Sequence, residues 1–597
     1  MDDLDALFGA IDELRSRAVA APGDHAAALA RISPGYLSSA RNLVAYLALR
    51  AADHRELQLA LGRWGLSSLG RIESHVVAAL DQVRARLDDA RVRRGAPAAA
   101  ALPPVATPTQ DDAERLLDDH TRALLGPPPA ARQVHVMITA PAAAVVDARW
   151  ADRVLDAGAD VLRVNAAHED ADAWLAIVTT VRAAAARAGR PCPIVVDLPG
   201  PKLRTVALGT GPRVVRWRPD KDELGRVRTP ARVALHPASR PAPPGPALAV
   251  PDALWPLTPD DQVRVRDARG RKRRLRVVDA ACATVERTVY LTPDATITVR
   301  RDGARRGRWR CDDVPARPFA LRVATGDRFR LLRPGVAAPP GVAAIGCTLD
   351  AAVRAIQPGH RVLFDDGHLE AVAEATDDAG ATLRVRRLAG ADFALRAEKG
   401  INLPDTRLDV PALGPDDERA LAFAVDHADV VEASFVRSPD DVRALHARLD
   451  ALGGRHLGVV LKIETGDAFA QLPAILLEAM TRPPVGVMIA RGDLAVEIGF
   501  ERLAEVQEEI LWLCEAAHLP VIWATQVLDT LARTGQPSRA EVTDAAMSGR
   551  AECVMLNKGP FVAEAVAALD DILRRMAAHQ HKKRSLFRRL AVAQPVA

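Results

Sequence analysis

Val485–Glu497 reads VGVMIARGDLAVE, an apolar run that ends at Arg491-Gly492-Asp493. A short apolar run that stops at a glycine predicts a strand buried on both faces. Asp493 then lies just beyond the carboxyl end of that strand, which is the edge of a parallel sheet or barrel where ligands bind. The alternative is a surface turn in which Asp493 caps the following helix.

Seven further apolar runs have the same character and alternate with helix-length segments. The eight predicted strands are residues 134–140, 160–166, 193–198, 430–435, 458–464, 485–490, 520–526 and 552–557. Eight βα units in series are typical of an α/β fold of the (β/α)8 TIM-barrel type. An open doubly wound sheet is the alternative, although it rarely needs eight near-equal units.

The barrel pattern is interrupted between the third and fourth strands. Residues 206–398 contain short segments that alternate polar and apolar residues between Gly and Pro, which predicts an inserted antiparallel β domain. Its segments 271–276 and 300–310 are strongly basic. We interpret them as solvated surface, and a nucleic-acid patch is the alternative, which the small number of aromatic residues suited to base stacking disfavours.

The remaining segments complete the predicted domain organisation. Residues 1–91 have apolar residues at three- and four-residue spacing, which predicts a helical domain. The predicted order is a helical domain (1–91), a Pro/Ala linker and lead-in helix (92–130), the first barrel part (131–205), the inserted β domain (206–398), the second barrel part (399–580) and a basic tail (581–597).

Composition restricts the class of protein. The chain has 597 residues and a net charge of +4, which is too small to indicate nucleic-acid binding. Six scattered cysteines without a CxxC pair argue against a zinc site or a disulfide framework and favour a cytoplasmic location. The N-terminus does not resemble a signal peptide, and no apolar run approaches the ~20 residues that cross a membrane.

Polar residues at the predicted strand ends should converge on one rim of the barrel. They are Arg163, Asn165, His168, Asp197, Lys202, Arg204, Ser434, Arg437, Lys462, Glu464, Asp493, Thr525 and Gln526. Two carboxylates from adjacent strands, Glu464 and Asp493, suit Mg²⁺, which completes its octahedron with water and phosphate oxygens. Paired acids for glycoside hydrolysis are an alternative. The nearby cations favour an anionic, phosphorylated substrate instead, and a rim network of salt bridges is the purely structural interpretation.

Ten motifs in one order resemble the pyruvate kinase family. They are VLRVNAAH (161–168), VVDLPGPKLRT (195–205), FDDG (364–367), KGINLP (399–404), ASFVR (433–437), LKIE (461–464), ARGDLAVEI (490–498), ATQVLDTL (524–531), PSRAEVTDAA (537–546) and ECVML (552–556). The resemblance covers about residues 131–575 and is weak within much of the inserted domain.

The resemblance implies Mg²⁺-dependent phosphoryl transfer from phosphoenolpyruvate to ADP, giving pyruvate and ATP, with Mn²⁺ as an alternative metal. It implies catalytic roles for Lys462 at the transferring phosphoryl group, Thr525 near the carbon that is protonated, and Arg163 at the phosphate. It further implies substrate contacts by Arg163, Lys462, Gly492, Asp493, Thr525 and Ser434, nucleotide contacts by Asn165, His168, Arg204 and Lys399, and metal ligation by Glu464 and Asp493. The inserted domain would be a lid that closes over the site.

Departures from the family pattern carry their own predictions. Where many members have Asn-Phe-Ser-His-Gly, this chain has Asn165-Ala166-Ala167-His168-Glu169, and Lys202 replaces a glutamate. This resembles the potassium-independent branch, in which the lysine ammonium supplies the missing charge, so potassium should not be required. The family's loop after strand eight is replaced by Asn557-Lys558-Gly559-Pro560. The family's C-terminal effector domain is also missing from this sequence, so we expect no allosteric control through it.

Three hypotheses remain open at this point. The first is an active, divergent pyruvate kinase acting on phosphoenolpyruvate and ADP. The second is a catalytically weak relative that binds a phosphorylated ligand and acts through its helical domain as a regulatory or interaction protein. The third is a barrel enzyme acting on another enolate or acyl phosphate. A homo-oligomer is compatible with each, and neither a membrane nor nucleic acid is expected as a partner.

Overall fold

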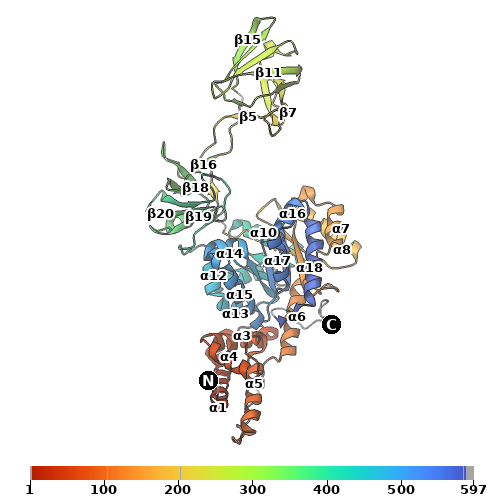
Figure 1. Cartoon of the computed structure of the whole chain (residues 1–597), viewed down its shortest axis with the longest axis vertical. Coiled ribbons are helices and arrows are strands. Elements are labelled where there is room, and N and C mark those ends of the chain that lie inside the picture. Colours follow the sequence, from red (N-terminus) through yellow and green to blue (C-terminus); the bar gives the residue numbers. More distant parts are fainter. Residues whose placement is uncertain (1–2, 104, 202, 313, 582–583, 586–597) are drawn as a thin grey trace, which may run out of the picture. The chain divides into compact units, whose positions relative to one another are not determined.

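A computed structural model describes residues 3–103, 105–201, 203–312, 314–581 and 584–585 (Figure 1). The chain divides into two compact units. The barrel unit comprises Met1–Lys202, His360–Gly367 and Asn402–Ala597, and the insert unit comprises Leu203–Gly359 and His368–Ile401. Residues 360–367, which the sequence analysis assigned to the inserted domain, therefore belong to the barrel unit.

Eight parallel strands close into a barrel in the order β1-β2-β3-β24-β25-β26-β27-β28, which confirms the predicted TIM barrel. Their bounds are β1 (His135–Thr139), β2 (Val161–Asn165), β3 (Ile194–Asp197), β24 (Val430–Ala433), β25 (Gly458–Ile463), β26 (Val485–Ala490), β27 (Val521–Ala524) and β28 (Cys553–Leu556). Each strand is shorter than or equal to its predicted run, and at the carboxyl ends this is because polar rim residues such as Glu464 and Thr525 leave the ladder.

Helices follow the strands and cover the outside of the barrel. They are α7 (Ala148–Asp156), α8 (Ala171–Ala188), α10 (Pro415–His427), α11 (Pro439–Ala451), α12 (Gly466–Ala470), α13 (Leu472–Ala479), α14 (Arg491–Ile498), α15 (Leu503–Ala516), α16 (Asp529–Thr534), α17 (Arg539–Ser548) and α18 (Val562–Ala577). Many begin at a side-chain cap: Asp147, Asp170, Ser438 and Ser538 each accept a hydrogen bond from a backbone N–H of the first turn.

The lead-in helix α6 (Gln110–Leu125) packs its last turn against the barrel interior. Leu124 and Leu125 join a buried cluster with Met137, Val161 and inward residues of other strands. A Cβ placed on Gly458 or Gly486 would lie 2.7 or 2.6 Å from a methyl group of Leu124. These two glycines thus make room for Leu124, and α6 forms part of the barrel core.

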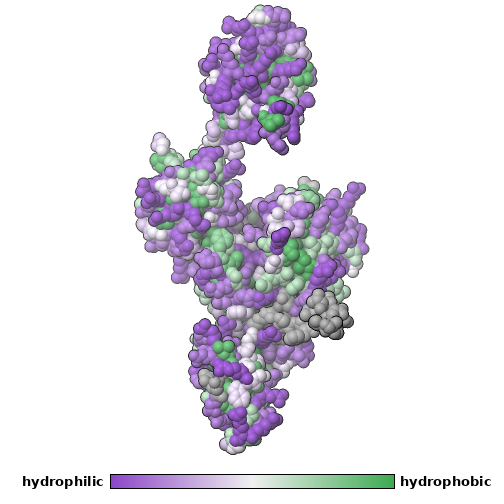
Figure 2. Space-filling model, in the orientation of Figure 1, coloured by the Kyte–Doolittle hydropathy of each residue, from purple (hydrophilic) through white to green (hydrophobic). Residues whose placement is uncertain are grey.

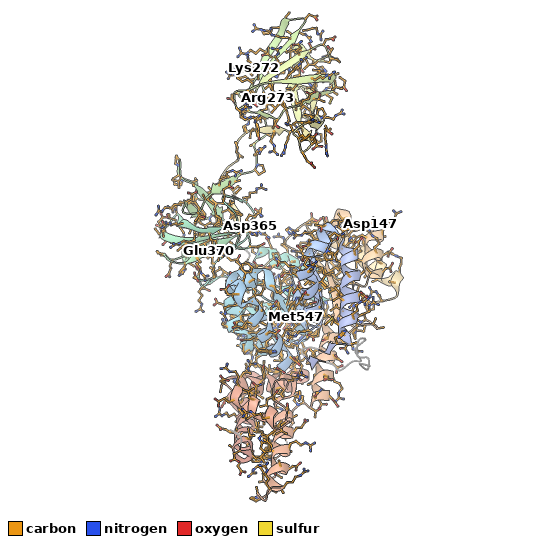
Figure 3. All side chains as sticks on the ribbon, in the orientation of Figure 1. Asp147, Lys272, Arg273, Asp365, Glu370 and Met547 are labelled. Carbon is orange, nitrogen blue, oxygen red and sulfur yellow. The ribbon has the colours of Figure 1, made fainter. Side chains whose placement is uncertain are left out.

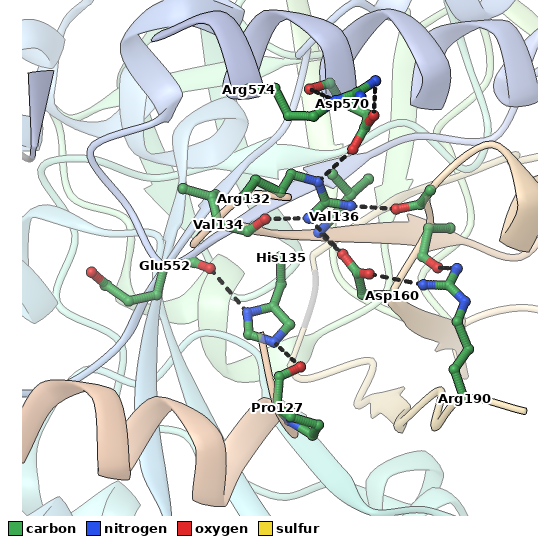
Figure 4. A network of polar contacts seen from close by, with 12 residues as sticks. Pro127, Arg132, Val134, His135, Val136, Asp160, Arg190, Glu552, Asp570 and Arg574 are labelled. Atoms are coloured by element: carbon green, nitrogen blue, oxygen red, sulfur yellow. Dashed lines mark hydrogen bonds and ion pairs between the residues drawn. The ribbon is translucent and has the colours of Figure 1, made fainter. Parts of the chain in front are cut away.

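The closure between β1 and β28 is supported by a buried polar network (Figure 4). Arg132 donates to Asp570 of α18 at 2.7 Å and pairs with Asp160 at 2.7 Å, and it also donates to the backbone carbonyls of Val134 and Gly158. One guanidinium therefore joins the chain segments before β1 and β2 to the last helix of the barrel.

The N-terminal helices form a layer that packs against the barrel within the same unit. They are α1 (Leu4–Asp24), α2 (Ala26–Leu29), α3 (Leu37–Arg50), α4 (Arg55–Arg63) and α5 (Val76–Val92). Asn42, buried in α3, donates to the carbonyls of Glu73 and Ala516 at 2.7 and 2.9 Å and accepts from Val76 N at 3.0 Å. His518, at the end of α15, contacts Ser39 Oγ and the Ser74 carbonyl.

The segment between β3 and β24 is almost entirely β structure. Its strands are β4 (Thr205–Val206), β5 (Val215–Trp217), β6 (Asp220–Lys221), β7 (Val227–Thr229), β8 (Ala231–Pro237), β9 (Ala247–Val250), β10 (Gln262–Arg266), β11 (Lys272–Asp279), β12 (Cys282–Val285), β13 (Val289–Leu291), β14 (Thr296–Arg301), β15 (Ala304–Arg310), β16 (Ala320–Val323), β17 (Arg328–Leu332), β18 (Ala344–Cys347), β19 (Arg361–Phe364), β20 (Leu369–Asp377), β21 (Gly380–Leu388), β22 (Phe393–Arg396) and β23 (Ile401–Asn402), with helix α9 (Asp350–Ala355) after β18.

The insert unit contains two larger sheets where the sequence predicted one antiparallel domain. One has the order β15-β14-β10-β11-β12-β8-β9 and its own buried cluster, which includes Trp217, Val263, Leu275 and Val299. The other includes β4, β17, β18, β20 and β21. The pairs β8–β9 and β17–β18 are parallel, and the other pairs of these strands are antiparallel.

Candidate active site

Lys462 is the central side chain at the carboxyl end of the barrel. It lies near the end of β25 and is only 7% exposed. Its Nζ donates to Ser434 Oγ at 2.7 Å and to Asp197 Oδ1 at 3.1 Å, and lies 3.2 Å from Glu464 Oε1. Side chains that follow or end three neighbouring strands, β3, β24 and β25, therefore hold one buried ammonium group.

Arg163 in β2 continues this cluster. Its guanidinium donates to Glu432 Oε2 at 2.8 Å, to Thr139 Oγ1 at 3.0 Å and to Asp197 Oδ2. Asp197 thus bridges Arg163 and Lys462 through its two carboxylate oxygens. Glu432 is fully buried in β24, and its second oxygen, Oε1, has no hydrogen-bond partner among the residues that the structure describes.

The charges of this cluster do not balance. Three carboxylates, those of Asp197, Glu432 and Glu464, surround the two cations of Arg163 and Lys462. Burial raises the pKa of Glu432 to about 7, since the attraction of Arg163 does not fully offset desolvation and the repulsion of Asp197. Desolvation opposes the charge on Lys462, but Asp197 and Glu464 outweigh it and raise its pKa.

Ser434 and Gly200 fix the position of the ammonium group. Ser434 Oγ donates to the Leu198 carbonyl at 2.7 Å while it accepts from Lys462. Gly200 has φ +66°, and a Cβ there would lie 2.7 Å from Ser434 Cβ. Only glycine fits both the backbone conformation and the space.

Thr525 follows β27 with an unusual backbone. Its φ is +65°, which is strained for a β-branched residue, and its buried Oγ1 has no hydrogen-bond partner among the described residues. A Cβ on Gly492 would lie 3.9 Å from Thr525 Oγ1, so the two residues are neighbours. Arg491 holds the Thr525 turn: it donates to the carbonyls of Ala524 and Thr525 and pairs with Asp544 at 2.9 Å.

Asp493 lies in the first turn of α14, which begins at Arg491. It is therefore not the N-cap that the alternative interpretation required. Asn402 Nδ2 donates to Asp493 Oδ1 at 3.5 Å and to Glu497 Oε1 at 3.2 Å. Burial, together with the charge of Asp493, raises the pKa of Glu497 to about 7 although the Asn402 hydrogen bond lowers it. The rim thus has a second region with excess negative charge.

The donor set fits a Mg²⁺ ion that takes few protein ligands. Glu464 and Asp493 offer carboxylate oxygens at the ends of the paired strands β25 and β26, and a divalent cation would offset the excess of acidic groups on both sides. Within the described part of the chain, no group of three or more His, Cys, Asp or Glu residues is arranged to hold a metal. Such a site would therefore depend on water and substrate oxygens for its remaining ligands.

The other predicted site residues are placed as follows. Asn165 Oδ1 accepts from Ala167 N at 2.9 Å, and the exposed His168 accepts at its carbonyl from Trp174 Nε1. Arg204 and Lys399 belong to the insert unit, where Arg204 donates to the Glu398 carbonyl at 3.0 Å. Lys202 lies outside the described residues.

The prediction that Arg437 points into the rim is wrong. Its guanidinium donates to the carbonyls of Leu408 and Val410 at 2.9 and 2.6 Å and lies 3.7 Å from Asp441. Arg437 therefore fastens the segment before α10 to the start of α11. The sequence pattern placed this guanidinium at the barrel rim. In the structure it is held instead by the carbonyls of Leu408 and Val410.

Sequence reasoning missed three residues that build the site. Glu432, Arg491 and Asn402 contact predicted site residues directly. A glutamate inside the apolar run VVEASF was a visible signal, since an unpaired carboxylate is rarely buried in a strand. The partners of Arg491 and Asn402 come from distant segments, so no local pattern marked them.

A family model described as "Pyruvate kinase, barrel domain" matches residues 316–566. The match includes β24 to β28 but not the first three barrel strands, so it is shorter than the resemblance seen in the sequence. It begins just before β16, and the sheet formed by β8 to β15 lies outside it.

Curated relatives agree with this match. "Pyruvate kinase PKLR" of Homo sapiens is 35% identical over 253 residues, which is 41% of this chain and 42% of that protein. "Pyruvate kinase 2" of Synechocystis sp. is 36% identical over 228 residues, or 37% of each chain. "Pyruvate kinase" of Hypocrea jecorina is 35% identical over 223 residues, covering 36% of this chain and 39% of that protein.

The chain thus spans about two fifths of the length of the relatives that it matches. Within that part lie the barrel strands β24 to β28, and Lys462, Glu464 and Asp493 all fall in the matched residues. Over residues 316–566 the chain is thus similar to the barrel domain of pyruvate kinases.

Proposed function

We propose that this chain catalyses Mg²⁺-dependent phosphoryl transfer between phosphoenolpyruvate and ADP, giving pyruvate and ATP. The observation that carries the proposal is the buried Lys462 ammonium, held by Ser434, Asp197 and Glu464 at the carboxyl end of the barrel. Active sites of this fold lie at that end. The relatives that carry the same barrel are named pyruvate kinases.

Lys462 and Arg163 supply fixed positive charge where a phosphoryl group and an enolate carry negative charge. Phosphoryl transfer needs mainly positioning and charge stabilisation, and both cations are already oriented by hydrogen bonds to buried groups. Glu464 and Asp493 would hold Mg²⁺, which would supply positive charge to the phosphate oxygens. Arg163 exchanges part of its contact with carboxylates for the substrate phosphate.

Thr525 and Gly492 would meet the enolate part of the substrate. The Thr525 hydroxyl is buried without a partner among the described residues and neighbours Gly492. It is therefore available for a hydrogen bond near the carbon that gains or loses a proton. The first turn of α14, which contains Gly492 and Asp493, offers backbone N–H groups to a carboxylate.

The nucleotide side of the proposal concerns Asn165, His168, Arg204 and Lys399. The first two lie in the loop after β2, and the other two lie in the insert unit. We assign the insert unit the role of a lid that excludes water when substrates bind.

Potassium should be dispensable in this reaction. The loop Asn165-Ala166-Ala167 offers no hydroxyl ligand, and Leu198 follows Asp197, so only the side-chain oxygens of Asn165 and Asp197 remain there for a monovalent cation. Lys202 is the proposed source of the missing charge. Strong activation by potassium over tetramethylammonium at matched ionic strength would overturn this part of the proposal.

One observation favours the alternative, a catalytically weak relative that binds a phosphorylated ligand. Glu432 adds a buried carboxylate that competes with a phosphate for Arg163. If this competition dominates, the protein will bind phosphoenolpyruvate weakly and turn it over slowly. A purified-protein assay distinguishes the two functions directly.

The test couples pyruvate production to lactate dehydrogenase with Mg²⁺, phosphoenolpyruvate and ADP. Lys462→Met should reduce kcat by at least about 100-fold, since one preorganised charge at the reacting group is lost. Lys221→Met is the matched control, because Lys221 is an exposed lysine of β6 in the insert unit. Equal turnover by both variants would refute the role of Lys462, and no turnover by the unaltered protein would favour the alternative.

A further inference from the structure

The sheet formed by β15, β14, β10, β11, β12, β8 and β9 has two different faces. Its inward residues, such as Val263, Leu275 and Val299, are buried in the core of this part of the insert unit. Successive side chains of a strand alternate between faces, so the residues between them form the outer face. Figure 2 shows hydrophilic residues over most of the visible surface of this region, labelled β11 and β15 in Figure 1.

Strand register places ten basic side chains on that outer face, which we call the arginine face. They are Arg232, Arg264, Arg266, Lys272, Arg274, Arg276, Arg300, Arg305, Arg308 and Arg310, and all are exposed. They form rows across the strands with neutral hydrogen-bonding residues between them. The central row runs Arg308, Thr298, Arg264, Arg274, and these are directly paired positions.

Several like charges face one another directly. Arg264 pairs with Arg274, Arg266 with Lys272, and Arg300 with Arg305. Like charges at directly opposed positions destabilise a sheet. The arrangement therefore opposes folding of this sheet unless another group neutralises it.

Arginines on the other face of the same strands form ion pairs with aspartates. Arg273 pairs with Asp267 at 3.3 Å, and Arg301 and Arg306 pair with Asp261 at 2.8 and 2.9 Å. Figure 3 labels Arg273 and its neighbour in β11, Lys272. In the described part of this region, which omits Asp313, the arginine face has no carboxylate within 4.0 Å of its basic groups. The same sheet thus compensates its inward arginines and leaves the outward ones to an external anion.

We propose that the arginine face binds the phosphate backbone of duplex nucleic acid without sequence preference. Strands are ~4.8 Å apart and alternate residues ~7 Å apart along a strand, which gives a dense and regular array of cations for phosphates. Thr284, Thr296, Thr298 and Gln262 lie between the arginines and provide neutral donors to phosphate oxygens.

The composition of the face distinguishes duplex from the other polyanions. Its strands present no aromatic residue outward for stacking against unpaired bases, since Trp217, Trp255 and Trp309 pack in the core and Tyr290 of β13 lies against Arg269. Val278, at the end of β11, is an exposed apolar residue beside these arginines, but a single valine makes neither a lipid-inserting surface nor the apolar centre typical of a protein interface. The net charge of +4 gave no sign of this face, because it sums the charges of all 597 residues and the acidic residues elsewhere offset these arginines.

The proposal is tested with the full chain and a fluorescently labelled 20-base-pair duplex in an anisotropy titration. With about five phosphates contacted, raising the salt concentration from 50 to 200 mM should weaken binding by about 500-fold. The variant Arg264→Gln/Arg274→Gln/Arg308→Gln removes the charges of the central row. It should weaken binding at least tenfold and reduce the log–log salt slope by about 2 to 3.

The matched control is Arg322→Gln/Arg384→Gln/Arg387→Gln, which removes the same total charge from exposed positions of β16 and β21. It should leave duplex binding unchanged, and phosphotransferase activity should be the same in both triple variants. Circular dichroism checks folding, and the single variant Arg264→Gln replaces the triple if that does not fold.

Four outcomes of the binding measurements would overturn the proposal as a whole, and a fifth would overturn its claim of no sequence preference. The four are absence of binding at 50 mM salt and 20 µM protein, equal loss of binding in the control variant, tighter binding of single strands than of duplex, and tighter binding of anionic phospholipid vesicles or polyglutamate than of duplex. Tighter binding of one duplex sequence over a scrambled one by more than about tenfold would also contradict the absence of base contacts.

Discussion

Titration of Glu432 should make the free energy of unfolding depend on pH, and the substitution Glu432→Gln should remove that dependence. In the folded protein its pKa is raised from 4.5 to about 7, chiefly by burial. The native state then binds this proton more tightly than the unfolded chain does. The contribution to stability is therefore fully present below pH 4.5 and is lost as pH rises through 7.

The magnitude follows from that rise. At 1.36 kcal/mol for each tenfold change, a pKa rise of about 2.5 corresponds to about 3 kcal/mol between pH 4.5 and 8. Glu432→Gln keeps the shape and an acceptor for Arg163 Nε but removes the titration. The variant should therefore gain up to about 3 kcal/mol relative to the unaltered protein as pH rises from 5 to 8, whatever the constant cost of burying its amide.

Urea unfolding followed by hydrogen-exchange mass spectrometry of peptides from β24 and β25 measures this difference at each pH. Glu564→Gln, at an exposed position of α18, is the control and should show a difference that does not change with pH. A pH-independent difference for Glu432→Gln would show that Glu432 stays ionised throughout, and the reasoning about charge imbalance would then be wrong.

Three further predictions concern parts of the fold that hold the site. Asn42→Ala should destabilise the protein by about 3 to 5 kcal/mol in urea unfolding, since three buried backbone groups lose their partner; a loss below about 1 kcal/mol would contradict this. Gly200→Ala should lower kcat at least tenfold by displacing Ser434, whereas Gly189→Ala, with a similar φ of +65° but open space, should cost only about 1 kcal/mol of stability and leave kcat unchanged. Burial lowers the pKa of His518 from 6.5 to about 4, so its contribution to stability is present above pH 6.5 and lost as pH falls through 4. The variant His518→Gln should therefore lose about 3 kcal/mol of the pH dependence of the unfolding free energy, measured from unfolding midpoints at a series of pH values.

Much of the barrel could be predicted because its strands carry a strong local signal. Residues 485–490 form β26 with the predicted bounds, since a parallel strand buried on both faces is apolar throughout. Lys462, Glu464 and Asp493 were found because polar residues stand out directly after such runs.

The partners of these residues could not be predicted in the same way. Which acid reaches Arg163, or which carbonyls accept from Arg491 and Arg437, depends on segments more than 25 residues away in the chain. The arginine face was missed for a related reason. The basic residues were visible as charge runs, but only the pairing register separates those facing outward from those that pair with Asp261 and Asp267.

The adjacent strands β3 and β24 have an implication for how the chain folds during synthesis. They pair in the barrel although residues 198–429 separate them. Joining the ends of an unstructured loop of that length costs about 5 kcal/mol in entropy. Folding of the intervening β domains first would shorten the flexible part of this loop. The entropy cost of pairing β3 with β24 would then be smaller. A variant that unfolds these domains should slow barrel assembly even when every barrel residue is unchanged.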